Sequence, residues 1–230
     1  PIAIQPRSWI AGAAKASFLF AAAAIMGATD TVMLGRLSTA AETGLYGVAA
    51  RFFVLMALPL NAAAIVISQR AARLYAEGDM AGLERVVRHT TWQAFLTTLV
   101  LAAISTLAAF NLSLLFGPGF ERAFTPLIIL VWVRVMIVAF GHPETVLAST
   151  GRIGLASLVV AGFAILNIPF NAILIPKFGA AGAAVATSTT FLLMTLFLSA
   201  LARLQLGVKT YPSAYSIRSG RKQTTERPGE

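Results

Sequence analysis

The sequence contains no cysteine, so it has no disulfide framework, no thiolate metal site and no cysteine nucleophile. It is also poor in charge, because only 12% of its 230 residues are charged, against roughly 25% in soluble domains. The hydrophobic share is 57%, and the mean hydropathy is +0.78. A water-soluble core cannot absorb that excess, so the composition excludes an ordinary soluble domain and indicates a membrane protein.

The apolar residues occur in long runs. Six stretches have the length of about 20 residues that a helix needs to cross ~30 Å of hydrocarbon. Their approximate ranges are 9–29, 44–68, 91–116, 124–149, 154–175 and 179–204. We therefore predict an all-α fold, a polytopic six-transmembrane-helix bundle in residues 1–206, in which short connections make consecutive helices antiparallel neighbours. The longer connection, 69–90, is predicted to form two short amphipathic helices at the membrane surface, broken at Gly78-Asp79.

Basic residues fall unevenly on the two sides of these spans. Twelve lie on the side of the termini: Arg7, Arg70, Arg73, Arg85, Arg88, Arg152, Arg203, Lys209, Arg218, Arg221, Lys222 and Arg227. Only Arg36, Arg122 and Lys177 lie on the other side. Because cytoplasmic loops collect Lys and Arg, both termini are predicted to be cytoplasmic. This topology explains the formal charge of +9 without a nucleic-acid partner, and the basic segment 207–230 is predicted to be a disordered tail.

Three basic residues fall inside predicted spans: Lys15, Arg51 and Arg134. Each costs about 2.5–3.5 kcal/mol at the bilayer centre, so such residues usually face a bundle interior or a water-filled cavity. Arg134 shares a helical face with Gly141 and Thr145, which predicts an inward-facing polar stripe. Lys15 is near the cytoplasmic end of its span, where its long stem can reach the interface, the reading we favour over a substrate contact.

Two further features concern polar side chains in or beside the spans. Asp30 follows the predicted end of the first span, and Arg51 is about two turns inside its own helix, so the two are predicted to be near enough for an ion pair. Arg51 is then either a structural clasp or a substrate contact. Asn167 and Asn171 are spaced to share one face around Pro169, where a kink is predicted.

No catalytic, metal or cofactor site is predicted. The two histidines are His89 and His142, and His142 is followed two residues later by Glu144. A histidine held by a carboxylate is a common catalytic arrangement, but two residues apart on a helix these side chains point in different directions. Nor does the chain contain a glycine-rich phosphate loop, so it is not predicted to be nucleotide-driven by itself.

Several segments together resemble the C-terminal lobe of polysaccharide-biosynthesis flippases, the O-antigen and exopolysaccharide branch of the multidrug/oligosaccharidyl-lipid/polysaccharide exporter superfamily. The segments are Asp30-Thr31-Val32-Met33-Leu34-Gly35-Arg36-Leu37, Gly44-Leu45-Tyr46-Gly47-Val48-Ala49-Ala50-Arg51, Leu115-Phe116-Gly117-Pro118-Gly119-Phe120, Thr150-Gly151-Arg152, Asn171-Ala172-Ile173-Leu174-Ile175-Pro176-Lys177-Phe178-Gly179 and Gly182-Ala183-Ala184-Val185-Ala186-Thr187. Each is short and rich in Gly and Ala. Their order and spacing carry the resemblance, which extends from about residue 30 to residue 207.

The resemblance implies two six-helix lobes that rock around a central cationic cavity. The expected substrate is a polyprenyl-pyrophosphate-linked glycan, and transport is coupled to an ion gradient across a bacterial inner membrane. Arg51, Arg134 and Lys15 are then candidate substrate contacts, and Asp30 is an ion-pair partner or coupling residue. The chain begins at Pro1 with no signal segment, and we expect a fragment that lacks the N-terminal lobe. The segment Gly141-His142-Pro143-Glu144-Thr145 departs from the more apolar run that the resemblance implies.

Three rival functions remain open. A multidrug exporter of the same superfamily would offer carboxylates to cationic drugs, yet no Asp or Glu lies in the middle of a predicted span. A non-transporting scaffold subunit would tolerate apolar replacements of Arg51 and Arg134. A membrane enzyme is the third.

Overall fold

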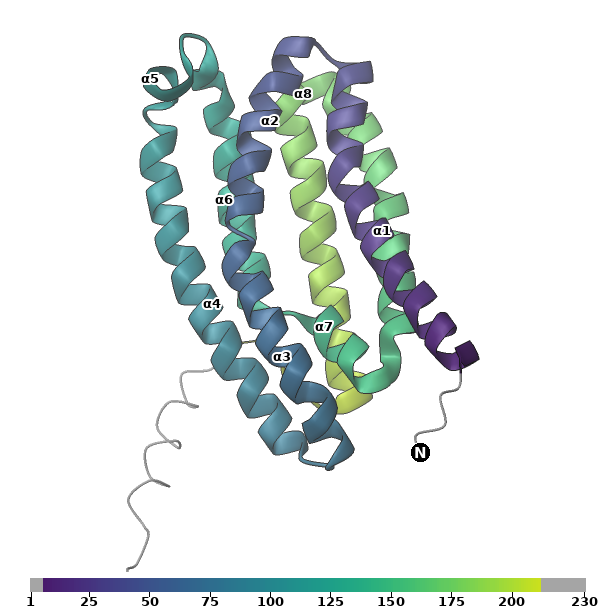
Figure 1. Cartoon of the computed structure of the whole chain (residues 1–230). Coiled ribbons are helices and arrows are strands. Elements are labelled where there is room, and N and C mark those ends of the chain that lie inside the picture. Colours follow the sequence, from purple (N-terminus) through teal and green to yellow (C-terminus); the bar gives the residue numbers. More distant parts are fainter. Residues whose placement is uncertain (1–5, 212–230) are drawn as a thin grey trace, which may run out of the picture.

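The computed structural model describes residues 6–211 and shows a bundle of long helices (Figure 1). The elements are α1 (Pro6–Leu37), α2 (Ala40–Leu55), α3 (Leu58–Ala76), α4 (Met80–Ala109), α5 (Leu112–Phe116), η1 (Phe120–Ala123), α6 (Phe124–Ala139), α7 (Pro143–Leu147), η2 (Ala148–Arg152) and α8 (Ile153–Leu206). Helices account for almost all of the described residues, and no strand occurs among them. The prediction of an all-α fold is confirmed.

Within residues 6–211, four helical stretches are long and apolar enough to cross a membrane: Ala16–Leu37, Ala40–Ala76, Met80–Ala109 and Phe120–Leu206. The last stretch has 87 residues and is folded back on itself, so it contains α6, α7 and both arms of α8. Many large apolar side chains point outward, including Leu204 at 81% and Leu114 at 83% exposure. Such a surface is stable when it faces lipid, and the chain is a multi-pass membrane protein.

The reversal of α8 occurs at Gly179, whose φ of 55° and ψ of −130° are not helical. The two arms are antiparallel, because Asn167 lies against Thr190 and Phe163 against Phe197, pairs that are nearly equidistant from Gly179. Gly179 thus separates the fifth and sixth predicted spans. Pro169 lies inside continuous helix, so the non-helical backbone angles occur ten residues beyond the predicted kink.

The predicted surface helices of residues 69–90 are not separate elements. α3 continues to Ala76 and α4 begins at Met80, so both are extensions of long helices, broken only around Gly78. Helical ion pairs support the extensions, since Arg73 contacts Glu77 at 2.9 Å and Arg88 contacts Glu84 at 2.8 Å. The predicted break at Gly78-Asp79 is confirmed, and the Asp79 side chain caps α4 by accepting from the Gly82 amide at 2.7 Å.

The predicted spans 91–116 and 124–149 are each too long at their C-terminal end. α4 stops at Ala109 and is followed by the short α5. α6 stops at Ala139, because Gly141 adopts a φ of 74° and Pro143 cannot donate a backbone hydrogen bond. Helical structure resumes with α7, which continues through the π-helical turn η2 into α8.

Three apolar clusters hold the bundle together. The largest joins α2, α4, α6 and α8, and the second packs α1 against both arms of α8. The third lies at the α3–α4 turn and includes Val208, which is 1% exposed. Thr210 is buried as well, so the described start of the predicted disordered tail packs against the bundle. Residues 212–230 of that tail lie outside the described part of the chain.

Candidate functional site

A buried carboxylate cluster is centred on Asp30, which is 1% exposed. The Tyr46 hydroxyl and the Asn171 amide each donate to it at 2.7 Å, and the Thr187 hydroxyl donates to it as well. These partners come from α2, from the first arm of α8 and from the second arm, while Asp30 itself belongs to α1. The cluster therefore joins helical segments that are more than 150 residues apart in the sequence.

The cluster continues into the space between the arms of α8. Asn171 donates to the side-chain oxygen of Asn167 at 2.8 Å, and the Asn167 amide donates to the Thr190 hydroxyl at 3.4 Å. The Asn171 side-chain oxygen has no hydrogen-bond partner among the described residues. Carboxylate, amide and hydroxyl oxygens around one buried charge suit a proton or a hard cation rather than a soft transition metal.

The structure corrects the predicted position of Asp30. α1 continues seven residues past Asp30 to Leu37, and Leu34 within this extension is fully buried. The carboxylate is thus inside the bundle and not at the end of a span. The predicted ion pair is wrong, since Arg51 is exposed and no contact between the two is found among the described residues.

Sequence reasoning did place Asn167 and Asn171 on one face, and the structure confirms that arrangement. It missed Tyr46 and Thr187. The available signal was the polar run from Thr187 to Thr190, which interrupts an otherwise small and apolar helix.

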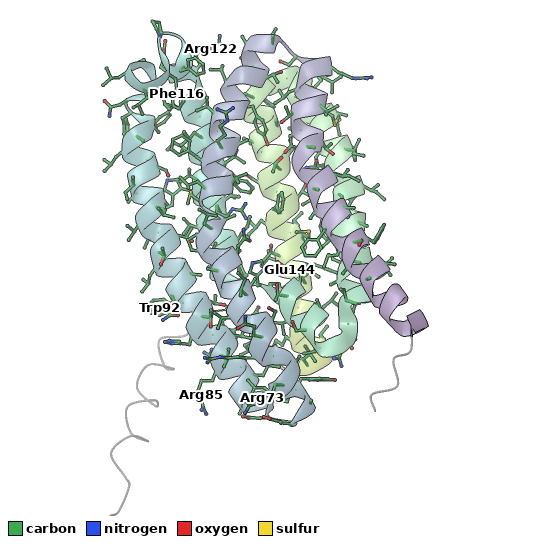
Figure 2. All side chains as sticks on the ribbon, in the orientation of Figure 1. Arg73, Arg85, Trp92, Phe116, Arg122 and Glu144 are labelled. Atoms are coloured by element: carbon green, nitrogen blue, oxygen red, sulfur yellow. The ribbon has the colours of Figure 1, made fainter. Side chains whose placement is uncertain are left out.

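A second site is a cavity of about 670 Å³ between α1, α3, α6, α7 and α8. Its walls are mostly apolar, with Leu19, Phe20, Met26, Leu60 and Phe191 among them. Its charged or titratable lining residues, within the described part of the chain, are Arg134, His142 and Glu144. Figure 2 places Glu144 in the interior of the bundle, away from Arg73 and Arg85 at one end and Arg122 at the other.

Arg134 is the buried cation of this cavity, with an exposure of 9%. Its guanidinium carbon lies 3.7 Å from the centre of the Phe53 ring, a cation–π contact. Its Nε has no hydrogen-bond partner, and no carboxylate lies within 4.0 Å among the described residues. Arg134, Gly141 and Thr145 all line the cavity, so the predicted inward-facing stripe is confirmed although the helix breaks between them.

His142 and Glu144 are in direct contact, which corrects the prediction that they point apart. The His142 Nδ1 meets a Glu144 carboxylate oxygen. The prediction assumed a continuous helix, but His142 has a φ of −118° and a ψ of 66° and precedes the first turn of α7. Gly141 and Pro143 on either side of His142 are residues typical of a helix break, and they could have indicated it.

The other two predicted contacts lie elsewhere. Arg51 is on α2 and does not line the cavity. The backbone of Lys15 belongs to α1, but its side chain lies outside the described residues. No group of three or more His, Cys, Asp or Glu side chains that could hold a metal ion occurs in the described part of the chain.

A bundle of membrane-length helices that encloses a buried carboxylate cluster and a charged cavity has the architecture of a multi-pass membrane transporter. A family model described as MatE matches residues 16–173. The chain belongs to this MatE family, whose members are transporters of the multidrug/oligosaccharidyl-lipid/polysaccharide superfamily.

Individual relatives agree with this assignment. The chain is 27% identical over 170 residues to a probable low-salt glycan biosynthesis flippase, Agl15, of Haloferax volcanii, covering 73% of the chain and 36% of the relative. Two solved structures share the fold at 21% identity. One is a transporter of the same superfamily from Pyrococcus furiosus, with a TM-score of 0.63 over 86% of this chain and 45% of that one. The other is an outward-facing multidrug resistance transporter, with a TM-score of 0.65 over 87% and 47%. The chain thus spans about half the length of the two solved structures and about a third of the length of the flippase.

Proposed function

We propose that this chain is one lobe of a flippase that moves a polyprenyl-pyrophosphate-linked glycan across a bacterial inner membrane for surface polysaccharide synthesis. The observation that carries the proposal is Arg134, a buried guanidinium that lines a largely apolar cavity and has no carboxylate within 4.0 Å among the described residues. A buried charge is costly, and this one has only the Phe53 ring and the more distant Glu144 to offset it, so a ligand of opposite sign would stabilise it. The similarity to a relative named as a glycan flippase supports the same choice.

The chemistry of the cavity fits such a substrate. A guanidinium stays charged and forms paired hydrogen bonds with phosphate oxygens. The apolar walls suit a hydrocarbon chain or the flat faces of sugar rings. In this proposal a second, N-terminal lobe completes the transporter, and both termini of this chain are cytoplasmic.

The Asp30 cluster is proposed as the coupling site. The hydrogen-bond donors to Asp30 are two hydroxyl groups and one amide N–H, all neutral, so a proton or a small monovalent cation could neutralise the buried carboxylate. Because its partners lie on α1, α2 and both arms of α8, occupancy of the site changes how these helices are held together. An ion gradient can then drive the rocking of the lobe.

Multidrug export is the second candidate, and one observation favours it. An exporter of cationic drugs was disfavoured because no Asp or Glu lies in the middle of a predicted span. The structure nevertheless contains two such carboxylates, since Asp30 is buried inside the bundle and Glu144 lines the cavity. Glu144 would attract a cationic drug, whereas Arg134 would repel it.

The deciding experiment replaces Arg134 in cells whose surface glycan depends on this transporter. We expect Arg134→Leu to abolish glycan export, because it removes the proposed contact to phosphate. Its protein abundance should stay normal, since loss of a charge makes membrane insertion easier. Arg134→Lys should retain part of the export, since Lys keeps the charge but loses the planar fork. Arg36→Leu, which alters an exposed arginine of α1, is the matched control.

Surface glycan and protein level are measured in the same cells, together with efflux of a cationic dye. Full glycan export by Arg134→Leu would overturn the proposal and favour a scaffold role. Increased dye efflux by that variant, without any glycan phenotype, would favour the multidrug exporter.

A further inference from the structure

We propose that His142 and Arg134 together form a phosphate-binding subsite, and that Glu144 is the positioning residue that orients the His142 ring. The inference rests on the proposed function for the lipid part of the ligand. The subsite itself requires only phosphate or pyrophosphate oxygens, which can belong to a lipid headgroup or to a free anion.

Two unpartnered nitrogen atoms mark the subsite. Arg134 Nε and His142 Nε2 are both buried, and neither has a hydrogen-bond partner among the described residues. Both residues line the same cavity. Of the buried side-chain atoms without a partner among the described residues, these two are the nitrogens of residues that line this cavity, so a ligand held there could supply the hydrogen bonds that they lack.

The local backbone fixes the direction of the imidazole ring. Gly141 has a φ of 74° and Pro143 begins α7, so His142 is held in a non-helical conformation between them. The Glu144 carboxylate then engages Nδ1, which leaves Nε2 as the free edge of the ring. This is the arrangement by which a carboxylate sets the tautomer and orientation of a working histidine.

The protonation state of the ring decides which ligand it takes. With Nδ1–H donated to Glu144, a neutral ring presents Nε2 as an acceptor, whereas a protonated ring presents Nε2–H as a donor. The protonated form is the one that binds phosphate beside Arg134. The other polar residues that line the cavity are uncharged, namely Asn61, Ser68, Thr145, Ser149 and Thr195. When the ring is protonated, the lining carries two positive groups, Arg134 and His142, against one negative group, Glu144, and this balance favours an anion.

The walls of the cavity suggest that the phosphate is attached to a lipid. Leu19, Phe20, Met26 and Leu60 extend from α1 and α3 beside the charged residues. A hydrocarbon chain next to a pyrophosphate matches this division between apolar and polar surface, and burial of each further CH₂ group adds affinity. A free anion would leave the apolar part empty.

The test uses the complete two-lobed transporter of the proposed function, purified in lipid nanodiscs, and measures binding of three probes: farnesyl pyrophosphate, farnesol and inorganic pyrophosphate. Farnesyl pyrophosphate should bind most tightly, and farnesol should bind at least tenfold more weakly because it lacks the anion. His142→Phe and His142→Gln should each weaken farnesyl pyrophosphate binding roughly tenfold, and Arg134→Gln at least as much. His89→Phe, at the exposed second histidine on α4, is the matched control and should bind as the parent does.

Two variants separate the proposed positioning role of Glu144 from the effect of its negative charge. Glu144→Gln and Glu144→Leu both remove the negative charge, but only Gln can still accept a hydrogen bond from Nδ1. If Glu144 positions the ring, Glu144→Gln should bind farnesyl pyrophosphate several-fold more tightly than Glu144→Leu. Equal affinities would overturn the positioning role.

The outcomes also distinguish this inference from the proposed function. If both His142 variants bind like His89→Phe while Arg134→Gln is weakened, the subsite is overturned and the flippase proposal stands. Inorganic pyrophosphate that binds as tightly as farnesyl pyrophosphate would support the subsite and contradict the lipid-linked substrate. Equal binding of farnesol, or no binding of farnesyl pyrophosphate by the parent transporter, would overturn both.

Discussion

At Asp30 one carboxylate receives hydrogen bonds from three side chains, those of Tyr46, Asn171 and Thr187. Each donor comes from a different helical segment. Replacement of the carboxylate by an apolar group removes the acceptor that these donors share, and each buried donor that finds no other acceptor costs about 1–3 kcal/mol. Asp30 therefore contributes to stability as well as to the proposed coupling, and the two roles must be separated by the choice of substitution.

Asp30→Asn keeps the size and one acceptor oxygen of the side chain but removes the charge. We expect it to remain folded near the parent melting temperature and to lose any stabilisation by sodium or by acid, because a ligand stabilises only a state that it binds. Asp30→Leu should melt at a clearly lower temperature in every buffer. The measurement is thermal unfolding of the purified chain in sodium and in choline buffers across a pH series. An Asn variant with the parent's ion and pH dependence would exclude Asp30 as the coupling site.

On the scale of elements, the break between α6 and α7 brings Gly141, His142 and Glu144 to the wall of the cavity. Gly141 ends the α6 segment with a positive φ and lies against Thr91 and the backbone of Thr210. A Cβ at Gly141 would come within 2.7 Å of the Thr210 carbonyl oxygen and of the Thr91 hydroxyl. The start of the C-terminal segment therefore packs against the same turn that positions His142.

Gly141→Ala tests that contact, with Gly151→Ala as a matched control. Both glycines have a positive φ, so each alanine costs about 1–2 kcal/mol of backbone strain. Only Gly141 also meets close neighbours, because nothing lies within 4 Å of a Cβ at Gly151. We expect Gly141→Ala to be less stable than Gly151→Ala by about 1–3 kcal/mol. Similar melting temperatures for the two variants would show that the Thr91 and Thr210 contacts do not constrain the turn.

On the scale of the whole molecule, charge is divided between the two ends of the bundle. Figure 2 shows Arg73 and Arg85 at the end of the α3–α4 turn and Arg122 at the opposite end. The ends differ in their total of basic residues, and the positive-inside rule assigns the richer end to the cytoplasm. This orientation also assigns α5 and the following loop to the outside.

Reporter fusions test the orientation. A reporter that is active only outside the cytoplasm should give no signal when fused after Leu206 and a strong signal when inserted in the range 117–122. The physical reason is that translocation of Lys and Arg is disfavoured, so the side that the sequence predicts to be richer in basic residues is expected to stay inside. The reverse pattern would overturn the topology and the assignment of both termini to the cytoplasm.

The sequence by itself determined the class of the molecule. Long apolar runs have no stable state in water, and a helix is the conformation that satisfies their backbone groups in lipid, so the all-α membrane fold could be predicted. Spacing along one helix also sufficed for the shared face of Asn167 and Asn171, because local helical geometry alone sets it.

Only the tertiary structure decided which polar side chains meet. Asp30 was expected beside Arg51, but its partners Asn171 and Thr187 are brought to it by the reversal of α8 at Gly179, far along the chain. His142 meets Glu144 because the chain leaves the helix at Gly141, a break that apolar periodicity does not reveal. In lipid every face of such a helix can be apolar, so hydropathy predicts that long helices form, while the packing of their small and polar residues decides where the charges converge.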